Sequence, residues 1–170
     1  MNKRNILTLL IVAVFAQIIL LGGMVALAAK PLYSGQEVRV ATLPIDPRSL
    51  FRGNYARLNY EFSTLPENAL AEHQHLRTGE PVYVTLVTGD GDLYEYAGVS
   101  LNKPESGVFI RGRLQNRRSR QRVKYGIEAW FAPKQEALRL ERELRDGAVA
   151  VLMIDSSGKA ALKDIVTSKN

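Results

Sequence analysis

The chain has 170 residues, no cysteine and a formal net charge of +6 at pH 7, and 46% of its residues are hydrophobic. This length suits one domain that is large enough to bury a core. The absence of cysteine excludes disulfides, thiol catalysis and thiolate metal sites.

The N-terminal residues predict a membrane segment. A short basic cap precedes an apolar run from 6 to 29, and a helix needs roughly 20 such residues to cross the hydrocarbon core. By the positive-inside rule the cap stays in the cytoplasm, so everything after Lys30 is delivered across the membrane. A signal peptide cleaved after Ala28 is the alternative, but its apolar core is usually about 7–15 residues long. We therefore expect an uncleaved signal-anchor over residues 1–30.

The next segment predicts the start of a separate domain. Residues 31–36 are expected to form a linker, because Pro31 should end the helix. Charged and apolar residues then alternate over 37–42, which predicts a half-buried strand. We expect the extracytoplasmic domain to cover residues 37–170.

Residues 46 to 62 combine turn signals with a strand signal. Turns are predicted at 46–48 and 52–54, and a strand over 55–62. Alternate residues of a strand share a face. The face expected to enter the core carries Leu58, Tyr60 and Phe62. Tyr55 falls on the opposite, polar face and has less reason to be a packing residue.

The rest of the chain predicts mostly strands. They are expected at 81–88, 93–101, 107–114, 122–131, 149–154 and 160–166. Asp90-Gly91 tolerates the positive φ angles of a tight hairpin turn. Two short helices are expected at 66–76 and 134–145. The predicted fold is therefore mainly β, with a compact antiparallel sheet or barrel and about two short peripheral helices behind a transmembrane helix.

Three blocks of this sequence carry a family resemblance. The first is Gly53-Asn54-Tyr55 with Leu58 and Tyr60, preceded by Asp46-Pro47-Arg48 and Arg52; the second is Tyr125-Gly126-Ile127-Glu128 with Phe131 and Pro133; the third is Gly158-Lys159-Ala160 with Leu162-Lys163. Together they resemble the GDYXXLXY family of bacterial membrane-anchored proteins. We call the first block the signature. The resemblance implies an anchored envelope domain. Its relatives look like companions of multi-pass membrane proteins, without an established biochemical activity.

The first two blocks have two interpretations, which both stay open. In the first, they form a docking or ligand surface, where a guanidinium can hold a carboxylate or phosphate bidentately. The residues of that surface are Arg48, Arg52, Gly53, Asn54, Tyr55, Arg57, Glu128 and Trp130. In the second, the blocks are structural. The structural residues are Asp46, Pro47, Leu58, Tyr60, Phe62, Tyr125 and Gly126.

Asn54 argues against an enzyme centred on the signature. The family name has Asp at this position, and Asn serves neither as an anionic base nor as a strong metal ligand. Asn54 can still serve in a turn or as a cap, because Asn and Asp both form such hydrogen bonds to the local backbone. We predict no catalytic residue, no cofactor and no metal site, and expect His73 and His75 to be exposed polar residues. One alternative is a hydrolase of peptide or peptidoglycan that uses Glu128, Asp46 or a Ser–Lys pair, for which the candidates are Ser34 with Lys30 and Ser100 with Lys103. The other alternative is a binder of small anionic ligands.

The basic run over 116–120 predicts an exposed loop. Its arginines, Arg117, Arg118 and Arg120, are candidates for contact with anionic lipid headgroups or with acidic loops of a partner. A merely solvated loop is the alternative, and nucleic acid is not expected outside the cytoplasm. The predicted protein is a single-pass module of the inner membrane with a periplasmic domain. We expect it to dock on a polytopic membrane protein through the signature turn.

Overall fold

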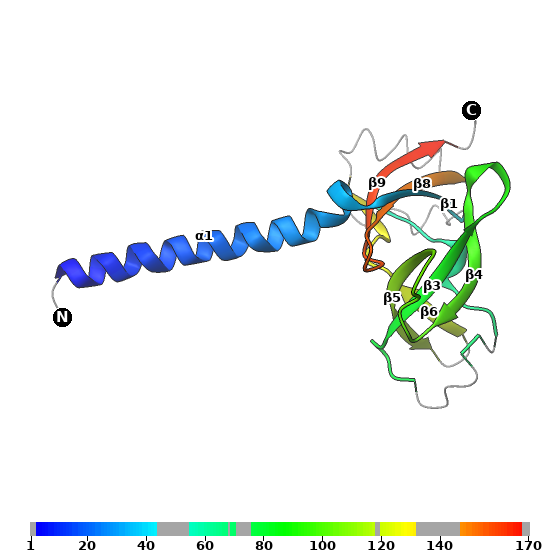
Figure 1. Ribbon diagram of the computed structural model, residues 1–170, viewed down its shortest axis with the longest axis horizontal. Coiled ribbons are helices and arrows are strands. Elements are labelled where there is room, and N and C mark those ends of the chain that lie inside the picture. Colours follow the sequence, from blue (N-terminus) through cyan, green and yellow to red (C-terminus); the bar gives the residue numbers. More distant parts are fainter. Residues whose placement is uncertain are drawn as a thin grey trace.

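The computed structural model describes residues 3–43, 55–67, 69–70, 76–117, 120–131 and 147–167. A long N-terminal helix leads into a domain built of antiparallel strands (Figure 1). This arrangement confirms the predicted mainly β fold with an N-terminal apolar helix. The helix predicted over 134–145 lies outside the described residues, as does most of the one predicted over 66–76. The described start of the latter forms a turn, in which the Ala69 amide donates to the Pro66 carbonyl.

Helix α1 spans Lys3–Ser34 and extends away from the domain as a rod (Figure 1). Its apolar part, Leu7–Ser34, has 28 residues, and none of its most apolar stretch is buried against the domain. At 1.5 Å per residue this part measures about 42 Å, which exceeds the roughly 30 Å of a hydrocarbon core. The helix is therefore long and apolar enough to cross a membrane, a test that both a membrane anchor and a signal sequence meet.

The described residues contain nine strands. They are β1 Gln36–Ala41, β2 Tyr55–Arg57, β3 Pro81–Thr88, β4 Tyr94–Ser100, β5 Val108–Arg117, β6 Arg120–Lys124, β7 Ala129–Phe131, β8 Ala148–Ile154 and β9 Ala160–Thr167. They form a three-stranded sheet β1-β8-β9, a two-stranded ribbon β2-β7, and a four-stranded sheet β4-β3-β5-β6 that curls into a half-barrel (Figure 1). Every neighbouring pair is antiparallel.

Contacts between the sheets close them around one core. A bridge between Arg39 and Leu93 joins β1 to the start of β4. The amide of Arg111 donates to the carbonyl of Gly158 at 2.7 Å, which joins β5 to the β8–β9 turn. Apolar side chains alternate with outward residues along the strands, as half-buried strands require. The fully buried core includes Val38, Val40, Tyr60, Val82, Val84, Ile110, Leu114 and Leu152.

The end of α1 is fastened to the domain. The prediction that Pro31 ends the helix is wrong, because α1 continues to Ser34 and Pro31 is fully buried. Proline has no N–H, so the carbonyl of Leu27 loses its helical donor. The Nζ of Lys159, from the β8–β9 turn, donates to that carbonyl at 2.9 Å. Lys159 thus replaces the hydrogen bond that Pro31 removes, and the predicted linker is reduced to one residue, Gly35.

Gly35 allows the abrupt change from α1 to β1. Its amide donates to the Pro31 carbonyl at 2.9 Å. A Cβ at this position would collide with that carbonyl oxygen and lie 2.9 Å from the Ile154 amide nitrogen. Only glycine therefore lets β1 begin beside β8 directly after the helix.

Asp155 organises the β8–β9 turn that carries Lys159. Asp155 is 6% exposed. Its Oδ1 accepts three hydrogen bonds: from the Ser157 amide at 2.8 Å, the Ser157 hydroxyl at 2.6 Å and the Lys159 amide at 3.1 Å. Burial raises the pKa of this carboxyl, but the hydrogen bonds from Ser157 and Lys159 outweigh it and hold the pKa below its ordinary value. The ionised carboxylate therefore fixes the turn.

Removing the Lys159 amine should cost stability only while Pro31 is present. In the natural sequence, Lys159→Met leaves the Leu27 carbonyl without its donor, and we expect a loss of about 1 kcal/mol in the free energy of unfolding. In Pro31→Ala, the new amide at position 31 supplies the helical bond, so the same change should cost little. Urea unfolding of the full chain in detergent micelles measures both. Equal losses in the two backgrounds would show that Lys159 does not compensate for Pro31.

The contribution of the Asp155 carboxylate should disappear in acid. Because its pKa is lower in the folded chain than in the unfolded chain, its stabilising effect is complete above the unfolded pKa of about 3.9 and is lost as pH falls through the folded pKa. Asp155→Asn should therefore be less stable than the natural chain at pH 7, with a difference that closes in the acid range. Urea unfolding across pH measures the difference, and a constant gap would contradict this linkage.

Candidate functional site

The β2–β7 ribbon brings the first two family-like blocks together. Its register pairs Tyr55 with Phe131 and Arg57 with Ala129. One residue further, the amide of Leu58 donates to the carbonyl of Glu128 at 2.9 Å. No spacing in the sequence links these segments. Backbone hydrogen bonds therefore join the signature to the second block from Tyr55 to Leu58.

The second half of the signature is buried, as predicted. Leu58 is 4% exposed, Tyr60 is fully buried and Phe62 is 3% exposed. The single strand predicted over 55–62 is wrong beyond Arg57, because a 3₁₀ turn, Glu61–Ser63, follows the extended residues. The Ser63 amide donates to the Tyr60 carbonyl at 3.0 Å and closes that turn. Phe62 thus reaches the core from a turn.

Two tyrosines bind the blocks to each other in opposite directions. The hydroxyl of Tyr60, from the signature, donates to the Ile127 carbonyl of the second block at 2.8 Å. The hydroxyl of Tyr125, from the second block, donates to the Phe62 carbonyl of the signature at 2.6 Å. Burial, followed by the nearby Glu128 carboxylate, raises the pKa of both tyrosines far above the ordinary value. Both hydroxyls therefore stay protonated and act as donors.

The aromatic rings of this pair pack around Phe62. Tyr60 and Phe62 stack with ring centroids 5.3 Å apart, and Phe62 meets Tyr125 edge-to-face at 5.2 Å. Both arrangements are favourable for aromatic pairs. We call the three rings and the two hydroxyl–carbonyl bonds the tyrosine lock.

Glu128 supports the backbone of the second block. Its carboxylate accepts hydrogen bonds from the amides of Tyr125 and Gly126, and Gly126 has a φ of +89° that favours glycine. The uninterrupted strand predicted over 122–131 is therefore wrong. The bend also shifts the alternation of faces. Ala129 is exposed, while Trp130, predicted to lie on the docking surface, is half-buried and packs against the core.

Half of the predicted docking residues precede β2 in the sequence. Those outside the described residues are Arg48, Arg52, Gly53 and Asn54, together with the structural candidates Asp46 and Pro47. The backbone of Tyr55 is described in β2, but its side chain is not. Arg57 is exposed, and it has no ion pair with any described residue. The docking roles of these residues stay predictions. The β2–β7 ribbon that follows them in the sequence is described.

The basic run is mostly strand rather than loop. Strand β5 continues through Arg117 and β6 begins at Arg120, and these two residues are register partners. Arg118 lies outside the described residues. The guanidinium of Arg122 donates from Nη2 to the Asn59 Oδ1 at 3.0 Å. Nothing in the sequence links these two positions, because the contact depends on how the signature packs beside β6.

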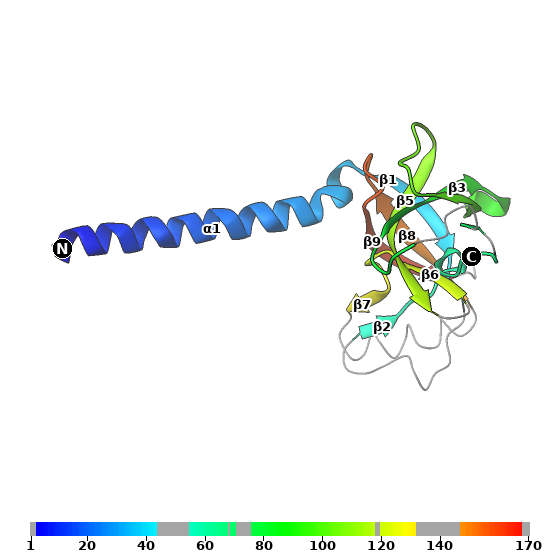
Figure 2. The same ribbon diagram turned by 90° about the horizontal axis from the view of Figure 1, so that it is seen from below.

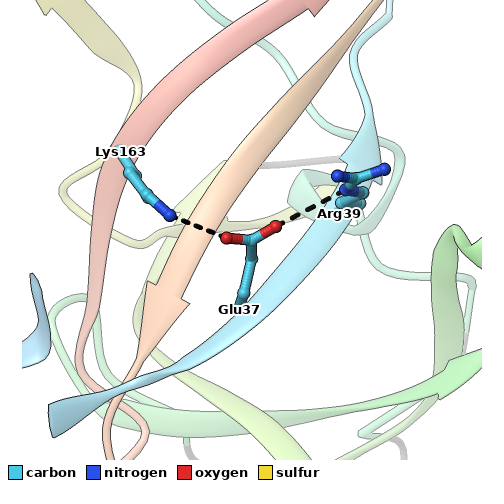
Figure 3. Close-up of polar contacts among 3 residues, drawn as sticks. All are labelled: Glu37, Arg39 and Lys163. Atoms are coloured by element: carbon cyan, nitrogen blue, oxygen red, sulfur yellow. Dashed lines mark hydrogen bonds and ion pairs between the residues drawn. The ribbon is translucent and has the colours of Figure 1, made fainter.

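The third block ties the N-terminal region to the domain. Lys159 binds the Leu27 carbonyl of α1. Lys163, four residues later on β9, donates to Glu37 of β1 at 2.8 Å, and Arg39 lies 3.6 Å from the other oxygen of Glu37 (Figure 3). Lys163 followed by Arg39 lowers the pKa of the Glu37 carboxyl, although exposed ion pairs of this kind stabilise little.

The residues considered for hydrolysis have other partners. The Ser34 hydroxyl donates to the Lys30 carbonyl at 3.1 Å, and the Ser100 hydroxyl accepts from the Asn102 amide at 3.0 Å. The Lys103 amine lies over the Phe109 ring. Within the described residues, no group of three or more His, Asp or Glu is placed to hold a metal ion, and His73 and His75 lie outside them.

Removing either hydroxyl of the tyrosine lock should destabilise the domain. Tyr60→Phe and Tyr125→Phe each leave a buried carbonyl without its donor, and we expect each to cost about 1 to 2 kcal/mol of unfolding free energy. Tyr83→Phe is the matched control, because the Tyr83 hydroxyl has no hydrogen bond to a described residue. Urea unfolding of the full chain in micelles compares the three. Losses no larger than that of the control would contradict the lock.

A family model described as GDYXXLXY protein matches residues 17–165 of this chain. No curated protein and no solved structure matches it. The match covers α1 from residue 17 onward, the tyrosine lock and the third block, so the three sequence blocks lie within one family region. The chain therefore belongs to the GDYXXLXY protein family.

Proposed function

We propose that this protein is a membrane-anchored extracytoplasmic binding module, which docks on a polytopic membrane protein through the signature segment. The observation that carries the proposal is the position of the β2–β7 ribbon. The ribbon lies on the side of the domain from which α1 leaves, offset from the helix (Figure 2). With α1 across the membrane, the ribbon is at the level of the membrane surface, where it can reach a neighbouring membrane protein.

The junction between α1 and the domain supports an uncleaved anchor in the cytoplasmic membrane, with the domain in the periplasm. Cleavage after Ala28 would remove the Leu27 carbonyl, which is the acceptor for Lys159. It would also turn Pro31, now fully buried, into part of a free N-terminus. Cleavage after Ala28 would therefore remove contacts on which the packing of the domain depends, which favours retention of the helix.

The chemistry of the ribbon supports docking over catalysis. The carboxylate of Glu128, the best available acid, is engaged by two backbone amides, and the lock hydroxyls are engaged by backbone carbonyls. These groups hold the ribbon in place. Arg57 is the exposed residue of the ribbon, and the predicted docking residues of the signature precede it in the sequence. A rigid support reduces the ordering cost of binding a partner.

A photo-crosslinker at position 55 should capture one membrane protein in intact cells. A second probe tests specificity at Gly91 on the β3–β4 turn, because Gly91 is exposed and lies outside the β2–β7 ribbon. Capture at position 55 but not at 91, identified by mass spectrometry, is the expected result. Capture should fall several-fold in Tyr60→Phe, because the ribbon loses its support.

Absence of any protein adduct at position 55, from a folded chain that stays in the membrane fraction, would overturn docking through the signature. The same adducts at positions 55 and 91 would also overturn it, because they would reflect general proximity. Either result would direct attention to small anionic ligands at the arginine-rich segment.

A further inference from the structure

The outer face of β5 and β6 is a second surface, formed by other strands than the signature ribbon. Residues of these strands alternate between the core and the outside, so the side chains opposite Ile110, Leu114 and Val123 point away from the core. The outward basic residues on this face are Arg111, Arg113, Arg122 and Lys124, of which three are exposed and Arg122 is half-buried. We call these four the basic face.

The charges of the basic face are not neutralised within the described part of the chain. Arg113 and Lys124 are direct register partners, and like charges opposite each other destabilise a sheet. The side chains of Arg113 and Arg122 donate to neutral acceptors, the Gly79 carbonyl and the Asn59 amide oxygen. No described carboxylate lies within ion-pair distance of the four. By contrast, Arg39 and Lys163 share Glu37 (Figure 3).

This face begins beside the end of α1. The Arg111 amide donates to the Gly158 carbonyl, and the next residue, Lys159, binds the Leu27 carbonyl of the helix. Both views show β5 on the side of the domain from which α1 leaves (Figures 1 and 2). Tyr33, near the end of α1, is 88% exposed, and such tyrosines are typical of the membrane–water interface.

We infer that the basic face binds the phosphate headgroups of anionic lipids in the membrane that α1 is proposed to cross. Arginine holds phosphate through paired N–H donors, and a basic residue near an anionic membrane strengthens attachment about fivefold. Lipid is favoured over an acidic protein because headgroups surround the helix end in every copy. The inference rests on the anchoring part of the proposed function and is independent of the docking partner.

Fluorescence quenching in nanodiscs tests this inference on the full chain. Because the chain has no cysteine, Gln115→Cys introduces one fluorophore site on the exposed side of β5. Nitroxide on a lipid headgroup reports how closely the face approaches the bilayer. We expect stronger quenching in discs that mix phosphatidylglycerol with phosphatidylcholine than in phosphatidylcholine alone. Added salt should weaken the difference, because it screens exposed charges.

Matched variants assign the effect to the basic face. Arg111→Gln with Arg113→Gln should lower the ratio of lipid-bound to released face about fivefold per charge. Arg39→Gln with Lys163→Gln removes the same charge from residues already paired with Glu37, and should leave quenching unchanged. The salt titration of the unsubstituted chain gives a second measurement that does not depend on how the variants fold.

Equal quenching in the two kinds of disc would overturn the inference and would favour an acidic protein as the occupant. An equal loss in both pairs of variants would also overturn it, because it would reflect net charge alone. A chain that does not stay with the discs would refute the anchor and the lipid contact together. A chain that stays but shows no lipid dependence refutes the lipid contact only, and photo-crosslinking at position 55 judges docking separately.

Discussion

Two buried tyrosine hydroxyls that require acceptors hold the signature region in place. A buried hydroxyl without a partner costs about 1 to 3 kcal/mol, so Tyr60 and Tyr125 must each reach a carbonyl that the sheet ladders leave free. Each finds it on the other's segment, at Ile127 and Phe62. The ribbon, the bend at Gly126 and the turn at Ser63 all follow from this exchange, because each brings one carbonyl to the right place. The final tyrosine of the signature is therefore an architectural residue.

The lock also determines what the remainder of the signature can do. With Leu58 and Tyr60 directed into the core, Tyr55 is held at the start of β2, opposite Phe131. Glu128 supports the same ribbon through the Tyr125 and Gly126 amides. The Glu128 carboxylate and the two tyrosine hydroxyls are thus engaged by backbone groups. This engagement is the structural support for the proposed docking role.

The junction at Pro31 connects this region to the apolar helix α1. A proline near the end of a long helix would normally weaken it, yet here the freed Leu27 carbonyl becomes an attachment point for Lys159. Asp155 holds the turn that presents Lys159, and Gly35 lets β1 follow the helix at once. These contacts connect α1 rigidly to the strands, so the ribbon and the basic face keep a defined position relative to the helix.

Features that depend on local sequence were predicted well. The apolar length of α1, the strands with alternating burial such as 81–88, and the turn at Asp90-Gly91 follow from hydrophobic pattern and glycine content, which act over a few residues. The burial of Leu58, Tyr60 and Phe62 also followed, because the signature alternates. The errors arose where short-range hydrogen bonds that the hydrophobic pattern does not reveal interrupt a strand or extend one. The Ser63 amide closes a turn on the Tyr60 carbonyl, and the Glu128 carboxylate holds the bend at Gly126, beyond which Trp130 turns inward. Arg117 and Arg120 pair where a loop was expected.

The hydrophobic pattern of the sequence is enough to predict that an apolar helix precedes a β-rich domain and that this domain carries the family signature. Which segments meet depends on tertiary structure: the signature with the second block, Arg122 with Asn59, and Lys159 with Leu27. Each of these contacts satisfies a polar group with a partner 63, 67 or 132 positions away. Such pairings depend on the packing of the whole core, which no local pattern of residues specifies.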